Sequence, residues 1–238
     1  MGLDNEHAHV TGRPWLAFDI ETAPLPDVAE YLTEPIEAPA NYKDPAKIAA
    51  YIAEKRMAQI AKAALDLDLC EIVAIAVQRS CHIGGAADCQ TRALADEAGM
   101  LDRFWNIVRV QQAHGCVLVG YNCLSFDLPV LLRRSLYLGV PVPSIQIDKY
   151  RHDGIIDLLA VLSHNGQQPM RSLGFYAKRF GIPHDDSVSG AEIPALAAAG
   201  EWDQIAAHCR ADVQTTAALA VRMGLICLPA PEPAAQVA

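Results

Sequence analysis

Four carboxylates in three separated segments are the side chains of this chain whose types and spacing best suit chemistry. Asp19 and Glu21 stand two residues apart, Asp127 lies near the middle of the chain, and Asp212 lies in its last third. Acidic side chains gathered from distant segments can hold two divalent metal ions, and two such ions can cleave a phosphodiester bond. Because every ligand is an oxygen, we expect two Mg²⁺ or Mn²⁺ ions rather than Zn²⁺.

The first acid pair stands at the end of an apolar run, residues 15–20, which the pattern predicts to be a buried strand. Side chains two residues apart in a strand point to the same face of the sheet. Asp19 and Glu21 should therefore project together from one edge. Acid pairs at strand ends are also common on protein surfaces, so this pair alone fits either interpretation.

Asp127 follows a predicted strand, residues 117–121, and begins a predicted helix that runs to Leu138. Ser125 or Asp127 can cap this helix, and Pro129 is tolerated in its first turn. The helix dipole favours a carboxylate here in any case, so capping is an alternative to metal binding for this residue.

His208 and Asp212 lie four residues apart in a predicted helix, residues 203–223, and so share one face. An imidazole beside a metal-binding carboxylate can orient or deprotonate an attacking water. A solvated helix face is the alternative for this pair taken alone. The three segments together, in this order, favour the catalytic interpretation.

The order D-x-E, then N-x-x-x-F-D at residues 122–127, then the final His-x-x-x-Asp resembles the DEDD superfamily of 3′–5′ exonucleases. Within it, the chain resembles predicted exonucleases related to the proofreading domain of family B DNA polymerases, over about residues 15–220. The resemblance implies a ribonuclease-H-like α/β fold, a mixed central sheet flanked by helices. Further stretches that carry it are residues 64–66 and 72–75, 148–151 and 156–158, 172–173 and 180–183, and 189–190 and 200–205.

One position departs from that subgroup. It normally has Tyr four residues before the final Asp, where this chain has His208. Another DEDD subgroup uses His one position further away, which here is Ala207. We hypothesise that His208 takes over the water-orienting role, because an imidazole titrates near neutrality whereas a phenol titrates near pH ~10.

The resemblance implies a two-metal mechanism that releases nucleoside 5′-monophosphates. One metal would be held by Asp19, Glu21 and Asp212 and carry the attacking water. The second would be held chiefly by Asp19, with Asp127 acting through water, and would stabilise the departing 3′ oxygen. The expected catalytic residues are Asp19, Glu21, Asp127, His208 and Asp212.

The neighbouring polar and aromatic residues are the expected substrate contacts, namely Thr22, Tyr121, Asn122 and Phe126. Asn122 offers hydrogen bonds, and Phe126 can pack beneath the site or under a base, while Gly120 permits close approach. Tyr121, Phe126 and Tyr150 are the stacking candidates for a single strand. We expect Asp157 to cap a helix or pair with Arg151 rather than bind metal.

The other elements predict one exonuclease domain, residues 14–224, with a Pro-rich and helical insertion at 24–70 and flexible tails at 1–13 and 228–238. Residues 24–40 contain several prolines and predict an irregular connection. Residues 155–162 fit strand or helix. The remaining expected strands are 72–78 and a weak 82–92, and the remaining expected helices are 46–65, 96–113, 172–180 and 193–199.

The net charge of −9 is unusual for a protein that grips nucleic acid by its backbone. Basic residues cluster locally, which predicts a basic groove on an acidic body and favours a short or single-stranded 3′ end. The clusters are Arg133 and Arg134; Lys149, Arg151 and His152; and Arg171, Lys178 and Arg179.

The seven cysteines are scattered and form no C-x-x-C pair, which predicts reduced thiols and a cytoplasmic protein. The sequence has no apolar run long enough to cross a membrane and no signal peptide pattern at its start. We expect the partner to be a nucleic acid with a free 3′ end, single-stranded DNA, in repair or proofreading beside an unidentified polymerase or repair protein.

Two alternatives stay open. An exonuclease that trims RNA or short oligonucleotides would use the same chemistry, because sugar discrimination depends on contacts near the 2′ position. A degenerate domain that only binds nucleic acid would explain the missing Tyr and the acidic charge. Four crowded carboxylates argue against it, since their repulsion is costly without bound metal.

Overall fold

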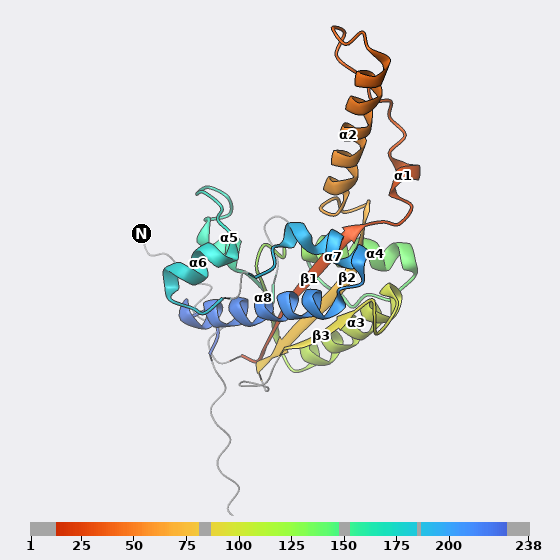
Figure 1. Ribbon diagram of the computed structural model, residues 1–238. Helices are drawn as coiled ribbons and strands as arrows, with labels where there is room; N and C mark the ends of the chain where they lie inside the picture. Colours follow the sequence, from red (N-terminus) through yellow and green to blue (C-terminus); the bar gives the residue numbers. More distant parts are fainter. Residues whose placement is uncertain (1–12, 81–86, 148–152, 185–186, 228–238) are drawn as a thin grey trace, which may run out of the picture.

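The computed structural model describes residues 13–80, 87–147, 153–184 and 187–227, and it has an α/β architecture (Figure 1). The strands are β1 (Trp15–Pro24), β2 (Cys70–Arg79), β3 (Asp88–Thr91), β4 (Val117–Gly120) and β5 (Ile155–Asp157). The helices are α1 (Val28–Tyr31), α2 (Pro45–Ala63), α3 (Glu97–Ala113), α4 (Asp127–Leu138), α5 (Leu158–Leu162), α6 (Leu173–Phe180), the 3₁₀ turn η3 (Gly190–Glu192), α7 (Ile193–Ala199) and α8 (Trp202–Arg222).

The five strands of the described chain form one mixed sheet in the order β3-β2-β1-β4-β5. β1 pairs antiparallel with β2 and parallel with β4, so it lies in the middle. β2 pairs antiparallel with β3, and β4 pairs parallel with β5. The prediction of a mixed central sheet flanked by helices is confirmed.

Alternation along β1 divides the core into two layers. Trp15 and Ala17 pack in one apolar cluster, which contains the buried side of α8. Leu16 and Phe18 pack in the other, against α3 and α4. The period of two continues toward the end of the strand, so residues 19 and 21 fall on the α8 side.

α8 presents a regular stripe to that layer. Ile205, Cys209, Val213 and Ala217 recur every four residues and are buried. Such spacing places them on one face of a helix, and α8 lies across the sheet in Figure 1. Functional residues that neighbour this stripe are therefore carried to the same face of β1.

The segment between β1 and β2 forms an arm that projects from the body (Figure 1). At its base, the Thr22 hydroxyl donates to the Ala64 carbonyl at 2.6 Å, and Leu25 N–H donates to the Leu69 carbonyl at 2.9 Å. Further out, the Arg56 guanidinium donates to backbone carbonyls of residues 32 and 34. The expected irregular connection therefore contains one short helix, α1, and α2 confirms the predicted long helix.

Three local expectations need correction or completion. Neither Ser125 nor Asp127 is the N-cap of α4, because Phe126 occupies that position and makes no side-chain capping hydrogen bond. Residues 155–162 are both strand and helix, divided at Asp157. The predicted third strand at 82–92 is β3, which spans Asp88–Thr91, and residues 82–86 of the prediction lie outside the described residues.

The predicted basic cluster at Arg133 and Arg134 is wrong as a nucleic-acid surface. Arg134 is buried and donates to both oxygens of Glu97, at 2.8 and 2.7 Å. Glu97 also accepts the Ile72 N–H at 2.9 Å, which ties α3, α4 and β2 together. Arg133 pairs with Asp68 at the surface. Lys149, Arg151 and His152 lie outside the described residues, as does Tyr150.

We predict that Arg134→Met lowers the free energy of unfolding by about 3–5 kcal/mol, because it leaves the Glu97 carboxylate buried without its partner. Arg133→Met is the matched control, since its ion pair is about half exposed and should leave the urea midpoint unchanged. Urea unfolding of the two variants measures the difference. Equal losses would contradict the structural role given to Arg134.

Candidate active site

The end of β1 and the middle of α8 bring three of the predicted residues into contact. His208 Nε2 lies 3.5 Å from Glu21 Oε1 and 3.9 Å from Asp212 Oδ2. Ligand atoms of all three lie within 4.8 Å of one another. The side chains of Glu21 and His208 are less than a tenth exposed, whereas Asp212 is a fifth exposed. The group therefore opens to solvent on the Asp212 side.

Asp19 lies beside Glu21 on the same face of β1, as the two-residue spacing predicts. Cys209 Sγ lies 3.7 Å from both the backbone carbonyl and the Oδ2 of Asp19. Ligand atoms of Asp19, Glu21 and Cys209 also fall within 4.8 Å of one another. The two groups share Glu21, so we treat Asp19, Glu21, His208 and Asp212 as one site, the acid cluster.

The loop between β4 and α4 carries Asp127 to the acid cluster. Asp127 is buried, and its negative charge raises the pKa of both Asp19 and Glu21. Gly120 makes the turn possible, because a Cβ there would meet the Cβ of Cys123 at 2.4 Å. The predicted close approach at Gly120 is confirmed.

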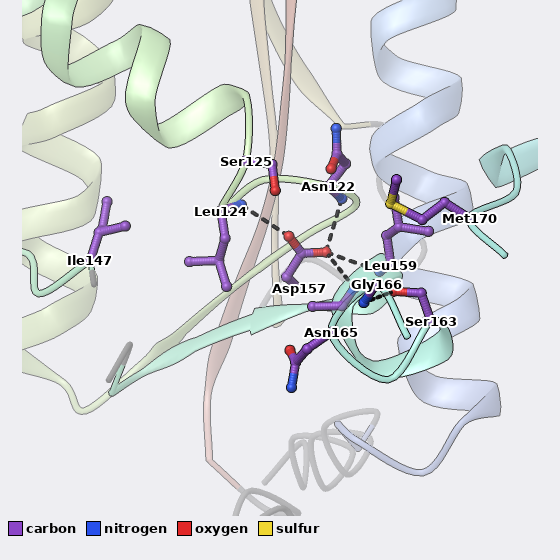
Figure 2. A pocket seen from close by; sticks show the side chains of 11 residues that line it. Asn122, Leu124, Ser125, Ile147, Asp157, Leu159, Ser163, Asn165, Gly166 and Met170 are labelled. Atoms are coloured by element: carbon purple, nitrogen blue, oxygen red, sulfur yellow. Dashed lines mark hydrogen bonds between the residues drawn. The ribbon is translucent and has the colours of Figure 1, made fainter. Parts of the chain in front are cut away.

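Asp157 holds the same loop from below (Figure 2). It caps α5, as predicted, by accepting the N–H groups of Leu159 at 2.9 Å and Ala160 at 3.2 Å. It also accepts the N–H groups of Asn122 at 2.9 Å and Leu124 at 3.0 Å. Asn122 has a positive φ of 61°, a conformation that is uncommon for residues other than glycine. Asp157 thus positions the loop that presents Asp127.

Burial and mutual repulsion shape the electrostatics of the site. Burial is the largest cause that raises the pKa of Asp19 and Glu21 well above the usual range, and the neighbouring carboxylates add to it. Burial likewise raises the pKa of Asp127 to about 7, against backbone hydrogen bonds that lower it. Carboxylates crowded in this way gain stability from any cation that binds among them.

The four residues expected to contact substrate differ in how far their side chains are already engaged within the protein. The Thr22 hydroxyl is already used by the Ala64 carbonyl, at the base of the arm. Tyr121 is half-buried, and its hydroxyl donates to the Arg171 carbonyl. Phe126 packs partly buried against the core. Asn122 lines an open pocket and is the one of the four whose surroundings suit a ligand directly (Figure 2).

The sequence did not predict that the thiols of Cys89 and Cys209 lie beside the acid cluster. The thiols of Cys89 and Cys209 are hydrogen-bonded, which lowers the pKa of Cys89. Burial raises the pKa of Cys209 well above the usual range. The adjacency of residue 209 to His208 was visible in the sequence, but its place against Asp19 depends on how α8 crosses β1.

One protein family is similar to most of this chain in sequence. A sequence model described as "Predicted 3'-5' exonuclease related to the exonuclease domain of PolB" matches residues 63–227, which include Asp127, His208 and Asp212 but not the β1 acids. No curated protein matches the chain significantly.

Among solved structures, the family B DNA polymerase of the hyperthermophilic archaeon Pyrobaculum calidifontis is similar over 89% of this chain and 24% of its own, with 20% identity and a TM-score of 0.58. Product-bound exonuclease I is less similar, covering 89% of this chain and 43% of its own at 15% identity and a TM-score of 0.47. The polymerase match shows a shared fold, and the chain spans about a quarter of that protein.

We predict that the metal-free protein loses thermal stability as the pH rises from about 4 to about 7. The sign follows because a carboxyl whose pKa is raised by folding stabilises the fold below its unfolded pKa, and this contribution is lost as pH rises through the folded pKa. Asp127→Asn should flatten the pH dependence of the melting temperature, whereas Asp102→Asn on α3 should not. A wild-type melting temperature that is constant over this range would contradict the raised pKa of the buried Asp127.

Proposed function

Because the chain belongs to the family of predicted 3′–5′ exonucleases related to the exonuclease domain of PolB, we propose that it removes nucleotides from the 3′ end of single-stranded DNA and releases nucleoside 5′-monophosphates. The observation that carries the proposal is the acid cluster. Carboxylates from β1 and α8 converge there on the buried side chain of His208, with Asp127 close enough to raise the pKa of Asp19 and Glu21.

The donor set suits divalent metal ions. Carboxylates that raise one another's pKa in a buried site need a compensating charge, and oxygen ligands favour Mg²⁺ or Mn²⁺. We propose that Asp19, Glu21 and Asp212 hold one ion, and that Asp19 holds a second with Asp127 nearby. Bound there, the ions would supply a water that ionises more easily and a charge that stabilises the leaving 3′ oxygen.

His208 is positioned to handle the proton of the attacking water. Its Nε2 faces Glu21 and Asp212, while its buried Nδ1 has no hydrogen-bond partner among the described residues. The imidazole therefore presents Nε2 to the acid cluster. We infer that the ring accepts a proton through Nε2.

The wider setting of the proposal is a nucleic acid with a free 3′ end, in DNA repair or in proofreading for a separate polymerase. We propose a cytoplasmic location, because no disulfide joins any cysteine in the described part of the chain and reduced thiols suit that compartment. No helix in that part combines the length and apolarity that a membrane span needs.

We predict that the purified protein shortens a 5′-labelled single-stranded DNA stepwise from its 3′ end in Mg²⁺ or Mn²⁺, and that EDTA stops the reaction. Asp19→Asn and Asp212→Asn should each reduce the rate by at least about a hundredfold, because each removes charge where transition-state charge must be balanced. Asp203→Asn, on the exposed first turn of α8, is the matched control and should keep the wild-type rate.

Parallel digestion of an RNA strand of the same sequence identifies the sugar preference. Faster shortening of the RNA would replace DNA with RNA in the proposal and leave the chemistry intact. Binding of both strands without cleavage in either metal would instead support a degenerate binding domain.

We predict that His208→Ala lowers kcat by about 10²–10⁴-fold, as expected for loss of a group that moves a proton in the transition state. His208→Tyr should recover part of this loss and move the pH at which the rate rises toward higher values, since a phenol titrates at about pH 10. The pH–rate profiles of the two variants are the measurement. An unchanged kcat in His208→Ala would remove His208 from the mechanism.

A further inference from the structure

One feature that the proposed chemistry leaves unused is an open pocket lined by the β4–α4 loop (Figure 2). Its volume is about 400 Å³, within the range of small-ligand sites. It lies between that loop, helix α5 and the segment that follows α5. We call it the loop pocket. The lining residues that matter below are Asn122, Leu124, Asp157, Leu159, Asn165 and Met170.

The described lining of the loop pocket offers no charged group that is available to a ligand. None of its described lining residues is basic, and its one carboxylate, Asp157, accepts four backbone N–H groups. A phosphate would find no cation there, and a cationic ligand would compete with bonds that Asp157 already makes. The lining therefore favours a neutral ligand.

The uncharged lining has two kinds of surface. Leu124, Leu159 and Met170 supply apolar walls, and a methionine thioether adapts well to flat aromatic faces. Asn122 and Asn165 supply amide groups that can both donate and accept hydrogen bonds. A flat ring with polar edges matches this combination, and nucleobases are such rings.

The walls are held in unusual backbone conformations. Of the described non-glycine residues with positive φ, Asn122 at 61° and Asn165 at 55° line the pocket, and His164 at 51° directly precedes Asn165. The segment after α5 is nevertheless well bonded, since Asn165 N–H donates to the Ala160 carbonyl at 2.7 Å and Gly166 N–H donates to Ser163 Oγ at 3.0 Å. Such conformations persist where surrounding structure fixes them, and they cluster at ligand sites.

The loop pocket is also coupled to the acid cluster through a short path. The loop that lines it with Asn122 and Leu124 continues directly into Asp127, and the charge of Asp157 raises the pKa of Asp127. Arg171 follows Met170 at the end of the wall and is exposed, with its guanidinium over the Phe175 ring. A strand with a base in the pocket would keep its phosphates outside, where this cation lies.

We propose that the loop pocket binds one unpaired nucleobase of the substrate strand close to its 3′ end, an inference that rests on the proposed function. A base inside the pocket cannot pair with a complementary strand, because its edge faces Asn122 and Asn165. The pocket therefore selects single strands, since a paired end must first give up a base pair.

The test measures binding of a short 5′-fluorescein oligothymidylate by fluorescence anisotropy in EDTA, with an abasic nucleotide placed in turn at each of the last few positions. Without metal, the acid cluster repels the intact and the abasic strands equally. Differences in affinity between these strands therefore report on the missing base alone. For the wild-type protein, we expect the abasic nucleotide to weaken binding about tenfold at one position and little at the others.

The test variant is Asn165→Gly with Met170→Ala. Glycine keeps the positive φ of residue 165 while it removes the amide, so the backbone is spared. This variant should bind the intact strand about tenfold more weakly and lose the position effect. Asn41→Gly with Met57→Ala is the matched control, because Met57 and Met170 are both 66% exposed and this pair lies on the arm and its helix.

An abasic series without a position effect, or one whose effect persists in the test variant, would overturn the loop pocket as a base site. Digestion of the same intact strand in Mn²⁺ is read separately and reports on the proposed function. If the wild-type protein does not cleave the strand but shows the position effect, the exonuclease proposal fails and the base site is supported. If it cleaves the strand without a position effect, the base site fails and the exonuclease proposal is supported.

Discussion

Repulsion among buried carboxylates is the constraint on which the rest of the structure depends. Glu21 and Asp127 are buried and Asp19 is partly buried. Burial is the largest cause that raises the pKa of each, and neighbouring carboxylates add to it. Such an arrangement opposes folding unless the surrounding elements fix it firmly. The scaffold meets this need by placing β1 in the centre of the sheet, with an apolar layer on each face. The acids stand where β1 extends beyond its pairing with β4 while it still pairs with β2, and the site opens to solvent at Asp212.

Asp157 shows how one side chain can organise two functions. Its carboxylate joins the end of β5, the first turn of α5 and the loop after β4 through backbone N–H groups. On one side this fixes the loop that ends at Asp127, and on the other it forms the floor of the loop pocket. A carboxylate satisfied by several N–H groups is stable without metal, whereas no backbone hydrogen bond from the described residues lowers the pKa of Asp19 or Glu21. The same residue type therefore serves as a structural anchor in one place and as a candidate metal ligand close by.

Local periodicity was sufficient to predict the parts of the site that lie within one element. The two-residue spacing in β1 and the four-residue spacing in α8 place Asp19 with Glu21 and His208 with Asp212, whatever the rest of the chain does. The fold class followed from the alternation of strands and helices and from the resemblance. Contacts between elements could not be predicted in this way. Arg134 was expected at the surface, but its partner Glu97 lies on another helix, and the bond from Asp157 to Asn122 N–H joins two strand ends that are distant in sequence.

The acidic composition of the chain is compatible with nucleic-acid binding if the protein recognises a base rather than the phosphates. Proteins that hold nucleic acid through its phosphates need many cations and lose affinity steeply as salt rises. Here one of the predicted phosphate-binding residues, Arg134, is buried in an ion pair with Glu97. A chain of net charge −9 has few other basic residues for contacts along many phosphates. A pocket that takes an unpaired base gains its affinity from contact with rings and base edges, which salt screens little. Cations bound among the carboxylates would add attraction only at the scissile phosphate. On this view the strand end is selected by a base on one side of the Asp127 loop and is cut on the other, and a strongly basic surface is not required.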